Sequence, residues 1–368
     1  MNVPMNEVLC EVRGQMGFVT LNRPQALNAL TLSMIRDLTI CLLAWREDDQ
    51  VKGVAIRGSN KAGPFGAFCA GGDIRFFYQA LLSGDPSPED FFTEEYTLNH
   101  LIHSYPKPFI AFMDGVVMGG GMGVSQGASH RLVTARTKMA MPETTIGLFP
   151  DVGGGYFLSR CPGSAGAWLA LTGTTLGATE AIELGLADHC LDAQQLPQAW
   201  ETLAALNPLD KVQMSTWIAT FKIATNSLDI RDRGRIDQYF SLSSVAAIVQ
   251  ALEADSSDWA QRTASQLRQR SPLMLGVAFE QIRRACHLTI AQDLRMERDM
   301  MRHCFFPAHL NRSGRQTDVA EGIRALVIDK TNAPVWHPRR IEDVTPDMVQ
   351  PFFDSPWPAH SHPLRLLA

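Results

Sequence analysis

Several features that mark large classes of protein are missing from this sequence. It has no run of 18 or more apolar residues, so we expect no membrane-spanning helix. Its 33 basic residues are scattered and outnumbered by 38 acidic ones, which argues against a nucleic-acid-binding face. Its seven cysteines form no C-x-x-C pair, so neither a disulfide framework nor a structural zinc site is expected. The N-terminus resembles neither a secretory signal nor an Arg-rich transit segment, and we therefore expect a cytoplasmic protein.

The chain is long enough to bury a large core. With 368 residues it suggests two domains, or one domain with a substantial appendage. Strand signals fade beyond about residue 194, helix-period segments follow, and prolines crowd the last stretch. We predict a mixed α/β region over 1–205, a helical region over 206–330 and an irregular tail over 331–368.

Local patterns predict strands and helices with definable ends. Thr31 is the expected N-cap of a helix over 32–46, and Thr179 that of a short helix ending at Gly185. Two short strands are expected within 7–21, one over 54–57, and a strand, glycine turn and helix start over 67–75. Further helices are expected at 88–104, 194–205, 210–224, 243–254, 258–270, 273–288 and 290–304.

One stretch, residues 109–155, carries most of the functional signal. An apolar strand over 109–113 leads to three glycines at 119–121 and then to a helix start. Glycines allow close backbone approach, and the first N–H groups of a helix lack internal partners, so this turn can hold an oxyanion. Two carboxylates, Glu143 and Asp151, follow the turn.

A second glycine turn precedes the first one in the chain. Gly71 and Gly72 end a predicted strand, so one backbone N–H from each turn can point at the same oxygen atom. Losing one such donor costs roughly 2.7–4 kcal/mol of transition-state stabilisation. Two tight turns without function are the alternative for this pattern.

Other candidate residues have ordinary structural explanations. Cys69 is better explained as a small buried thiol than as a nucleophile. Asp151 follows a proline and also fits a simple turn. Only one of Glu94 and Glu95 can face a cleft, because neighbouring residues on a helix point about 100° apart. Three histidines, His100, His103 and His130, do not form a metal-ligand set with the carboxylates. We therefore predict no metal site.

These motifs resemble the crotonase, or enoyl-CoA hydratase/isomerase, superfamily, and within it the 3-hydroxyisobutyryl-CoA hydrolase branch. The similarity covers about residues 8–338. Its most specific part is the phrase from Met-Pro-Glu at 141–143 to Phe-Pro-Asp-Val-Gly-Gly-Gly at 149–155. The other matching segments are 21–30, 67–75, 94–96, 119–121 and 321–336.

The resemblance implies a spiral of repeated ββα units with a C-terminal helical region. It also implies that the N–H groups of Gly72 and Gly120 hold the thioester oxygen. Hydratases of the superfamily look to carry a second glutamate at the position of Gly123, so its absence disfavours hydration. In the hydrolase branch Glu143 works with Asp151, and Glu95 contacts substrate.

The implied activity is hydrolysis of a short 3-hydroxyacyl-CoA, foremost 3-hydroxyisobutyryl-CoA in valine degradation. Glu143 would act as nucleophile or general base, and Asp151 would orient water or the substrate hydroxyl. The alternatives are hydration or double-bond isomerisation of a short acyl-CoA and, more remotely, a non-catalytic scaffold subunit. No cofactor is expected because coenzyme A is part of the substrate, and a homo-oligomer is left open.

Overall fold

The computed structural model describes residues 6–225 and 230–368, which form two compact units. Each unit is discontinuous in sequence: the first holds 1–72, 97–140 and 175–228, and the second holds 73–96, 141–174 and 229–368. The boundaries of these units differ from the predicted domain boundaries at 205 and 330. The predicted domains stay predictions.

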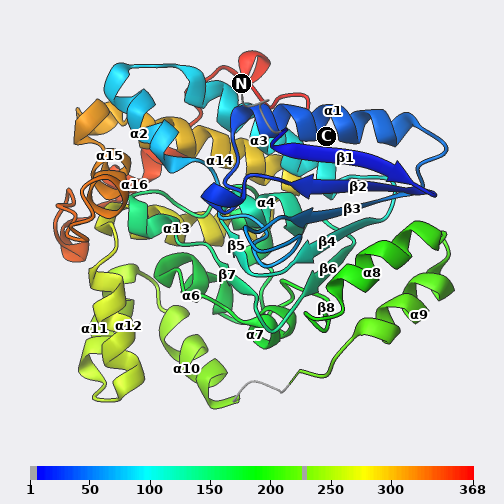
Figure 1. Ribbon diagram of the computed structural model, residues 1–368. Coiled ribbons are helices and arrows are strands. Elements are labelled where there is room, and N and C mark those ends of the chain that lie inside the picture. The colour runs from blue at the N-terminus through cyan, green and yellow to red at the C-terminus, as the bar shows by residue number, and fades with distance from the viewer. Residues whose placement is uncertain (1–5, 226–229) are drawn as a thin grey trace. The chain divides into compact units, whose positions relative to one another are not determined.

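The first unit contains the strands. Its larger sheet has the order β1-β2-β3-β4-β6-β8, in which β1 and β2 are antiparallel and the other neighbours are parallel (Figure 1). A second sheet pairs β5 with β7 in parallel. The bounds are β1 Val8–Arg13, β2 Met16–Leu21, β3 Gly53–Gly58, β4 Phe109–Met113, β5 Val116–Met118, β6 His130–Val133, β7 Lys138–Ala140 and β8 His189–Cys190.

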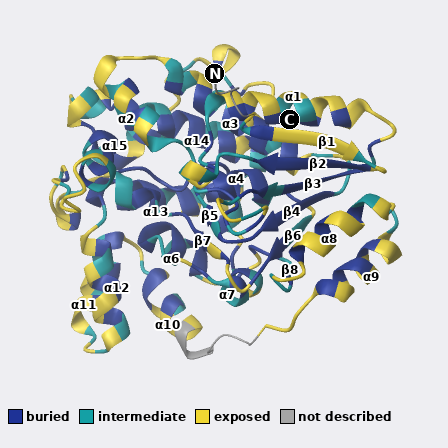
Figure 2. Ribbon diagram, in the orientation of Figure 1, coloured by how far each residue is buried: buried dark blue, intermediate teal, exposed yellow. Residues whose placement is uncertain are grey.

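Burial along the strands follows their place in the sheet. The edge strand β1 is mostly exposed, whereas every residue of β2 and β4 is buried (Figure 2). Parallel strands covered on both faces have continuous apolar sequences, which is why Phe109–Met113 could be recognised as a strand. The antiparallel edge pair is a hairpin whose turn contains Gly14 at φ 58°.

Helices of the first unit cover this sheet. They are α1 Leu32–Glu47, α4 Gly120–Gln126, α7 Ala178–Glu183, α8 Leu196–Thr202 and α9 Lys211–Phe221. Side chains of α8 and α9 join strand residues in one apolar cluster around Trp200, which is 0% exposed. Its ring lies edge-on to Phe18 with 4.8 Å between centroids, and the Arg57 guanidinium lies 4.2 Å from its ring centroid. Such aromatic pairs contribute about 0.5–1.5 kcal/mol beyond the area that they bury.

The second unit is helical. It contains α2 Ile74–Ser83, α5 Gly154–Leu158, α6 Ala165–Thr172, α10 Ile230–Phe240, α11 Val245–Ala254, α12 Asp258–Arg268, α13 Pro272–Ala285, α14 Ile290–Phe305, α15 Asp318–Ile323 and α16 Pro346–Val349. Helix α3, Ser87–His103, belongs to this unit up to Tyr96. Side-chain oxygens of Ser244, Ser257, Ser271 and Thr289 cap four of the helices by accepting first-turn N–H groups.

The structure corrects several expected boundaries. Residues 67–72 form only isolated bridges, including Cys69 to Val117, because short turns replace the continuous ladder of a strand. Gly177, not Thr179, is the N-cap of α7, and the Glu180 carboxylate accepts its backbone N–H; Gly185 follows this helix at φ 75°. The expected helix over 210–224 ends at Phe221.

Five of the α-helices that the structure describes were not expected from the sequence: α5, α6, α10, α15 and α16. Charges and a glycine interrupt the apolar pattern of α10, in which Ile236, Tyr239 and Phe240 are buried among residues 233–240. The tail from 331 contains only short helical segments. No helix in 6–225 or 230–368 combines the length and the apolarity needed to cross a membrane.

Candidate active site

The glycine turn at 119–121 lies at the start of α4 in the first unit. Gly119 adopts φ 49° and ψ −120°, a conformation that glycine accommodates readily, and Gly120 is the first residue of the helix. The Gly120 N–H is thus a first-turn amide that has no acceptor within its own helix. A side chain at Gly121 would place its Cβ 2.4 Å from the carbonyl oxygen of Cys69, so the two turns pack with no space for one.

The turn at Gly71–Gly72 lies against the first one. The Met118 N–H donates to the Cys69 carbonyl over 3.0 Å, and the Leu30 N–H donates to the Gly71 carbonyl over 2.7 Å. Gly71 has φ 103°, and a Cβ on it would lie 3.6 Å from the Gly120 nitrogen. The structure therefore brings together the two turns that the sequence singled out. The function of their N–H groups as oxyanion donors stays a prediction.

The second unit brings together the three carboxyl groups singled out by the sequence. Glu95 on α3, Glu143 at the start of a 3-10 turn, and Asp151 in the loop before α5 are 2%, 6% and 7% exposed. The Tyr96 hydroxyl donates to Asp151 Oδ2 over 2.8 Å. Glu94, in contrast, is half-buried, so the helix selects Glu95 as the inward residue.

Burial raises the pKa values of all three carboxyl groups. It raises the pKa of Asp151 to about 6, although the Tyr96 hydrogen bond acts in the opposite direction. Burial, followed by the Asp151 charge, raises the pKa of Glu143 and that of Glu95 well above their usual range. Burial thus favours the protonated form of all three carboxyl groups, and the Tyr96 hydrogen bond offsets part of this effect at Asp151. Carboxyl groups with separated pKa values can serve as a base and an acid at the same pH.

Two oxygen atoms of the cluster are buried and form no hydrogen bond with the described residues. They are Oε1 of Glu95 and Oε2 of Glu143. Buried polar atoms are nearly always paired in folded proteins, so unpaired ones at a carboxyl cluster indicate where a polar ligand or water binds.

Sequence reasoning missed the residues that hold this cluster. Tyr96 is adjacent to Glu95, yet its contact with Asp151 joins positions 55 residues apart. Glu297 accepts hydrogen bonds from the backbone N–H groups of Gly153 and Gly155 over 2.7 and 2.9 Å. Gln281 donates to the Pro150 carbonyl over 2.7 Å. A polar residue in an amphipathic helix usually faces solvent, so no local signal distinguished Gln281 and Glu297.

The position expected to carry a second glutamate in a hydratase is occupied by Gly123, a buried residue of α4. It contributes no side chain. Among the described residues, no group of three or more His, Cys, Asp or Glu side chains has an arrangement that could hold a metal ion.

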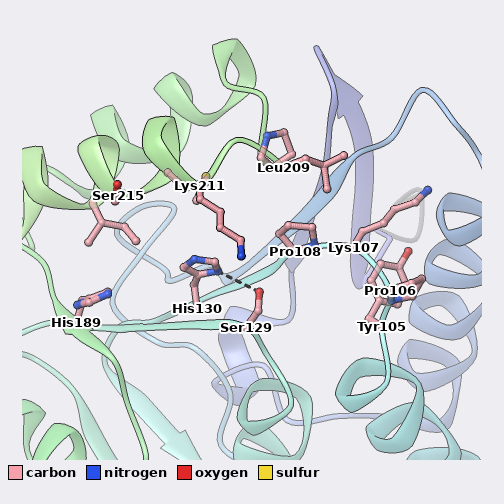
Figure 3. A pocket seen from close by; sticks show the side chains of 13 residues that line it. Tyr105, Pro106, Lys107, Pro108, Ser129, His130, His189, Leu209, Lys211 and Ser215 are labelled. Carbon is pink, nitrogen blue, oxygen red and sulfur yellow. Dashed lines mark hydrogen bonds between the residues drawn. The ribbon is translucent and has the colours of Figure 1, made fainter.

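A pocket of about 560 Å³ lies elsewhere in the first unit, at the amino ends of β4, β6 and β8 (Figure 3). Lys211 reaches toward His130, and Ser129 Oγ lies 3.0 Å from His130 Nδ1. Lys107 points away, and its amino group donates to the carbonyl of Trp45 in the last turn of α1 and to that of Asp48, the residue after this helix. No carboxylate and no glycine turn lines this pocket, so none of the predicted thioester chemistry belongs to it.

Comparison with known proteins identifies the fold and the family of this chain. The fold is of the crotonase type. Two solved structures superpose with a TM-score of 0.85: a carnitinyl-CoA dehydratase from Mycobacterium thermoresistibile and an enoyl-CoA hydratase from Rhodobacter sphaeroides. Their sequences are 36% and 33% identical to this chain. Each match covers 95% of this chain, and the two matches cover 96% and 98% of the solved chains.

The enoyl-CoA hydratase/isomerase family model matches residues 16–353, and the chain belongs to this family. Among similar proteins are the mitochondrial 3-hydroxyisobutyryl-CoA hydrolases of Xenopus tropicalis and Homo sapiens. They are 38% and 36% identical to this chain, and both matches span 95% of it and 89% of the relative.

The expectation of a cytoplasmic protein is contradicted by these relatives, whose names place them in mitochondria. That expectation depended only on the character of the N-terminal residues. No feature of the fold or of the carboxyl cluster depends on it.

Proposed function

We propose that this chain hydrolyses the thioester of a short 3-hydroxyacyl-CoA, foremost 3-hydroxyisobutyryl-CoA, to the free hydroxy acid and coenzyme A. Curated relatives with this activity in their names are 35–38% identical over most of the chain. The observation that carries the proposal is the buried cluster of Glu95, Glu143 and Asp151, in which one group ionises near neutrality. Valine degradation is the pathway that the resemblance implies for this reaction.

In the proposed reaction, the N–H groups of Gly72 and Gly120 polarise the thioester carbonyl. Asp151 removes a proton from water, and the resulting hydroxide forms a bond to the carbonyl carbon. Collapse of the tetrahedral intermediate breaks the carbon–sulfur bond, and the thiolate of coenzyme A takes a proton from Glu143. The raised pKa of Glu143 supports its use as this acid.

A covalent route uses the same residues in a different order. Glu143 first gives its proton to Asp151 and then attacks the carbonyl carbon, forming a mixed anhydride and expelling the thiolate; water then cleaves the anhydride. A single turnover in ¹⁸O-water detects the covalent route when water cleaves the anhydride at the enzyme's carboxyl carbon. Direct attack by water puts the label into the hydroxy acid at the first turnover, whereas the covalent route, with water attacking the enzyme's carboxyl carbon, puts it into Glu143.

Glu95 is the proposed contact for the substrate hydroxyl, because its Oε1 atom is buried without a partner among the described residues. A pocket that pairs a substrate hydroxyl discriminates strongly against analogues without it, since its own polar group is then left unpaired. We propose no separate cofactor, because coenzyme A is part of the substrate.

Hydration or dehydration of an acyl-CoA is the second candidate. It is favoured by the two similar structures, one of a protein named a dehydratase and one of a protein named a hydratase. Hydration by a pair of glutamates needs a side chain that Gly123 lacks, and we therefore place this activity second.

The test is the substitution Glu143→Gln, assayed by release of free thiol from 3-hydroxyisobutyryl-CoA. Turnover should be lost while binding of the thioester, measured by calorimetry, persists, because the amide keeps the shape of the side chain but neither transfers a proton nor attacks. Glu94→Gln is the matched control, a neighbouring glutamate outside the cluster, and should keep wild-type turnover. Unchanged turnover in Glu143→Gln contradicts the assigned function of this residue.

A further inference from the structure

The loop that carries Asp151 has an unfavourable backbone. Val152 adopts φ 56° and Gly153 φ 88°, so two consecutive residues after Asp151 are left-handed. This conformation is rare for a β-branched residue such as valine. The Gly154 N–H donates to the Asp151 carbonyl over 2.7 Å, but that bond lies within the turn itself. Contacts from outside the loop must therefore hold this conformation.

Glu297 of α14 supplies contacts on the C-terminal side of Asp151. Its Oε2 accepts the Gly153 N–H over 2.7 Å and its Oε1 the Gly155 N–H over 2.9 Å. Both carboxyl oxygens are thus used, one for each glycine. The Asp151 charge is also among the causes that raise the pKa of Glu297, after burial and Asp293, which indicates that the two groups interact.

Gln281 of α13 supplies a contact on the N-terminal side of Asp151. Its Nε2 donates to the Pro150 carbonyl over 2.7 Å and to Glu297 Oε1 over 3.0 Å. The residues before and after Asp151 are therefore fixed by two side chains that are bonded to each other, both 0% exposed. The two helices that carry them hold the loop as one unit.

A carboxyl group is a costly choice for this position. Asp293 lies one helical turn before Glu297, is also 0% exposed, and accepts the Tyr156 N–H over 2.8 Å. No lysine or arginine forms an ion pair with Glu297 in the described part of the chain, and Arg298 pairs with Glu89 instead. Apolar side chains of similar volume often stabilise a fold as well as buried charges do. An apolar side chain could not accept hydrogen bonds from the backbone N–H groups of the loop, and this explains a carboxyl group at position 297.

We propose that Glu297 is a positioning residue for the reaction. With Gln281, it clamps the backbone on both sides of Asp151 and so keeps the Asp151 carboxylate on the Tyr96 hydroxyl. The inference rests on the proposed function in assigning Asp151 to catalysis, but the clamp is defined by the contacts themselves.

The experiment compares Glu297→Gln with wild type in kcat, KM and the pH dependence of kcat. Glutamine has a single accepting oxygen, so one glycine N–H loses its partner. We expect kcat to fall ~10–100-fold with KM little changed, as for small misplacements of a catalytic group. The acid limb of the profile should move to higher pH, because a displaced Asp151 loses the Tyr96 bond that lowers its pKa.

Two further variants separate the clamp from general stability. Thr289→Ala removes the N-cap of the same helix, where Thr289 Oγ accepts the Gln292 N–H, and should lower the melting temperature without moving the acid limb. Gln281→Met removes only the second part of the clamp. It should shift the profile in the same direction as Glu297→Gln, and the double variant should be no worse than Glu297→Gln alone.

Amide exchange over 151–158 reports the clamp independently of substrate. It should quicken in Glu297→Gln and Gln281→Met, and stay unchanged in Thr289→Ala. Wild type that releases no thiol overturns the proposed function. Unchanged exchange and an unmoved acid limb overturn the inference, and Gln281→Met decides the outcome if Glu297→Gln does not fold.

Discussion

Removal of the Tyr96 hydroxyl is the most informative change to the carboxyl cluster. Tyr96→Phe keeps the buried ring but deletes the donor that lies 2.8 Å from Asp151 Oδ2. The hydrogen bond favours the charged form of Asp151, so its loss raises the pKa of Asp151 above the present value of about 6. If the carboxylate is the reactive form, the acid limb of the pH profile moves to higher pH.

The size of the shift follows from the strength of the bond. A hydrogen bond to a charged group contributes about 1.5–3 kcal/mol. One pKa unit corresponds to about 1.36 kcal/mol, so the limb should move by roughly 1–2 units. Well below both pKa values, kcat should therefore drop roughly 10–100-fold, while the two enzymes converge at alkaline pH where Asp151 is ionised in both.

The assay is thiol release at saturating substrate across the pH range. Tyr105→Phe is the matched control, because the Tyr105 hydroxyl donates to the Leu42 carbonyl over 2.8 Å and not to Asp151. Its profile should match that of wild type. An acid limb in Tyr96→Phe that stays in place, or moves to lower pH, would refute the assignment of that limb to Asp151.

Three further changes test other parts of the molecule. Gly71→Ala forces φ 103° on a residue with a side chain, beside the Met118 carbonyl at 3.2 Å, and should lower kcat by ~10²–10³-fold if the turn supplies an oxyanion donor. Thiol release measures this, and near-normal kcat would contradict the donor assignment. Glu95→Gln should narrow the preference for a 3-hydroxyacyl over an unsubstituted acyl thioester, measured as the ratio of kcat/KM values; an unchanged ratio would place the hydroxyl elsewhere. Trp200→Ala should cost about 3–5 kcal/mol in urea unfolding, whereas Ile40→Ala, at 68% exposure, should change little.

The sequence predicted best those features that are encoded in short segments. The apolar run 109–113 predicted β4, and Thr31 predicted the start of α1, where its side chain accepts the Met34 N–H. The glycine motifs predicted both turns, and the resemblance predicted the crotonase-type fold that the similar structures show.

Features that depend on distant residues could not be predicted in this way. Tyr96 meets Asp151 across 55 positions, and Glu297 meets Gly153 across 144. Helix α10 is stabilised by burial of Ile236, Tyr239 and Phe240, although its own sequence is largely charged. A surface helix with the same composition would have the same local pattern, so only tertiary packing distinguishes the two.

The ionisation of the cluster is a further property that the sequence left open. The pKa values of the Glu143 and Asp151 carboxyl groups follow from the residues that surround them in the fold. Tyr96 favours the charged form of Asp151, whereas Glu143 has an unpaired oxygen atom and experiences the Asp151 charge. This difference makes Asp151 the proposed base.

The central claim is that the chain cleaves a thioester and does not hydrate a double bond. Parallel assays on purified protein test it most directly, one of thiol release from 3-hydroxyisobutyryl-CoA and one of hydration of crotonyl-CoA. Rapid thiol release with little or no hydration is the result predicted here. Hydration of crotonyl-CoA without thiol release from 3-hydroxyisobutyryl-CoA would contradict it.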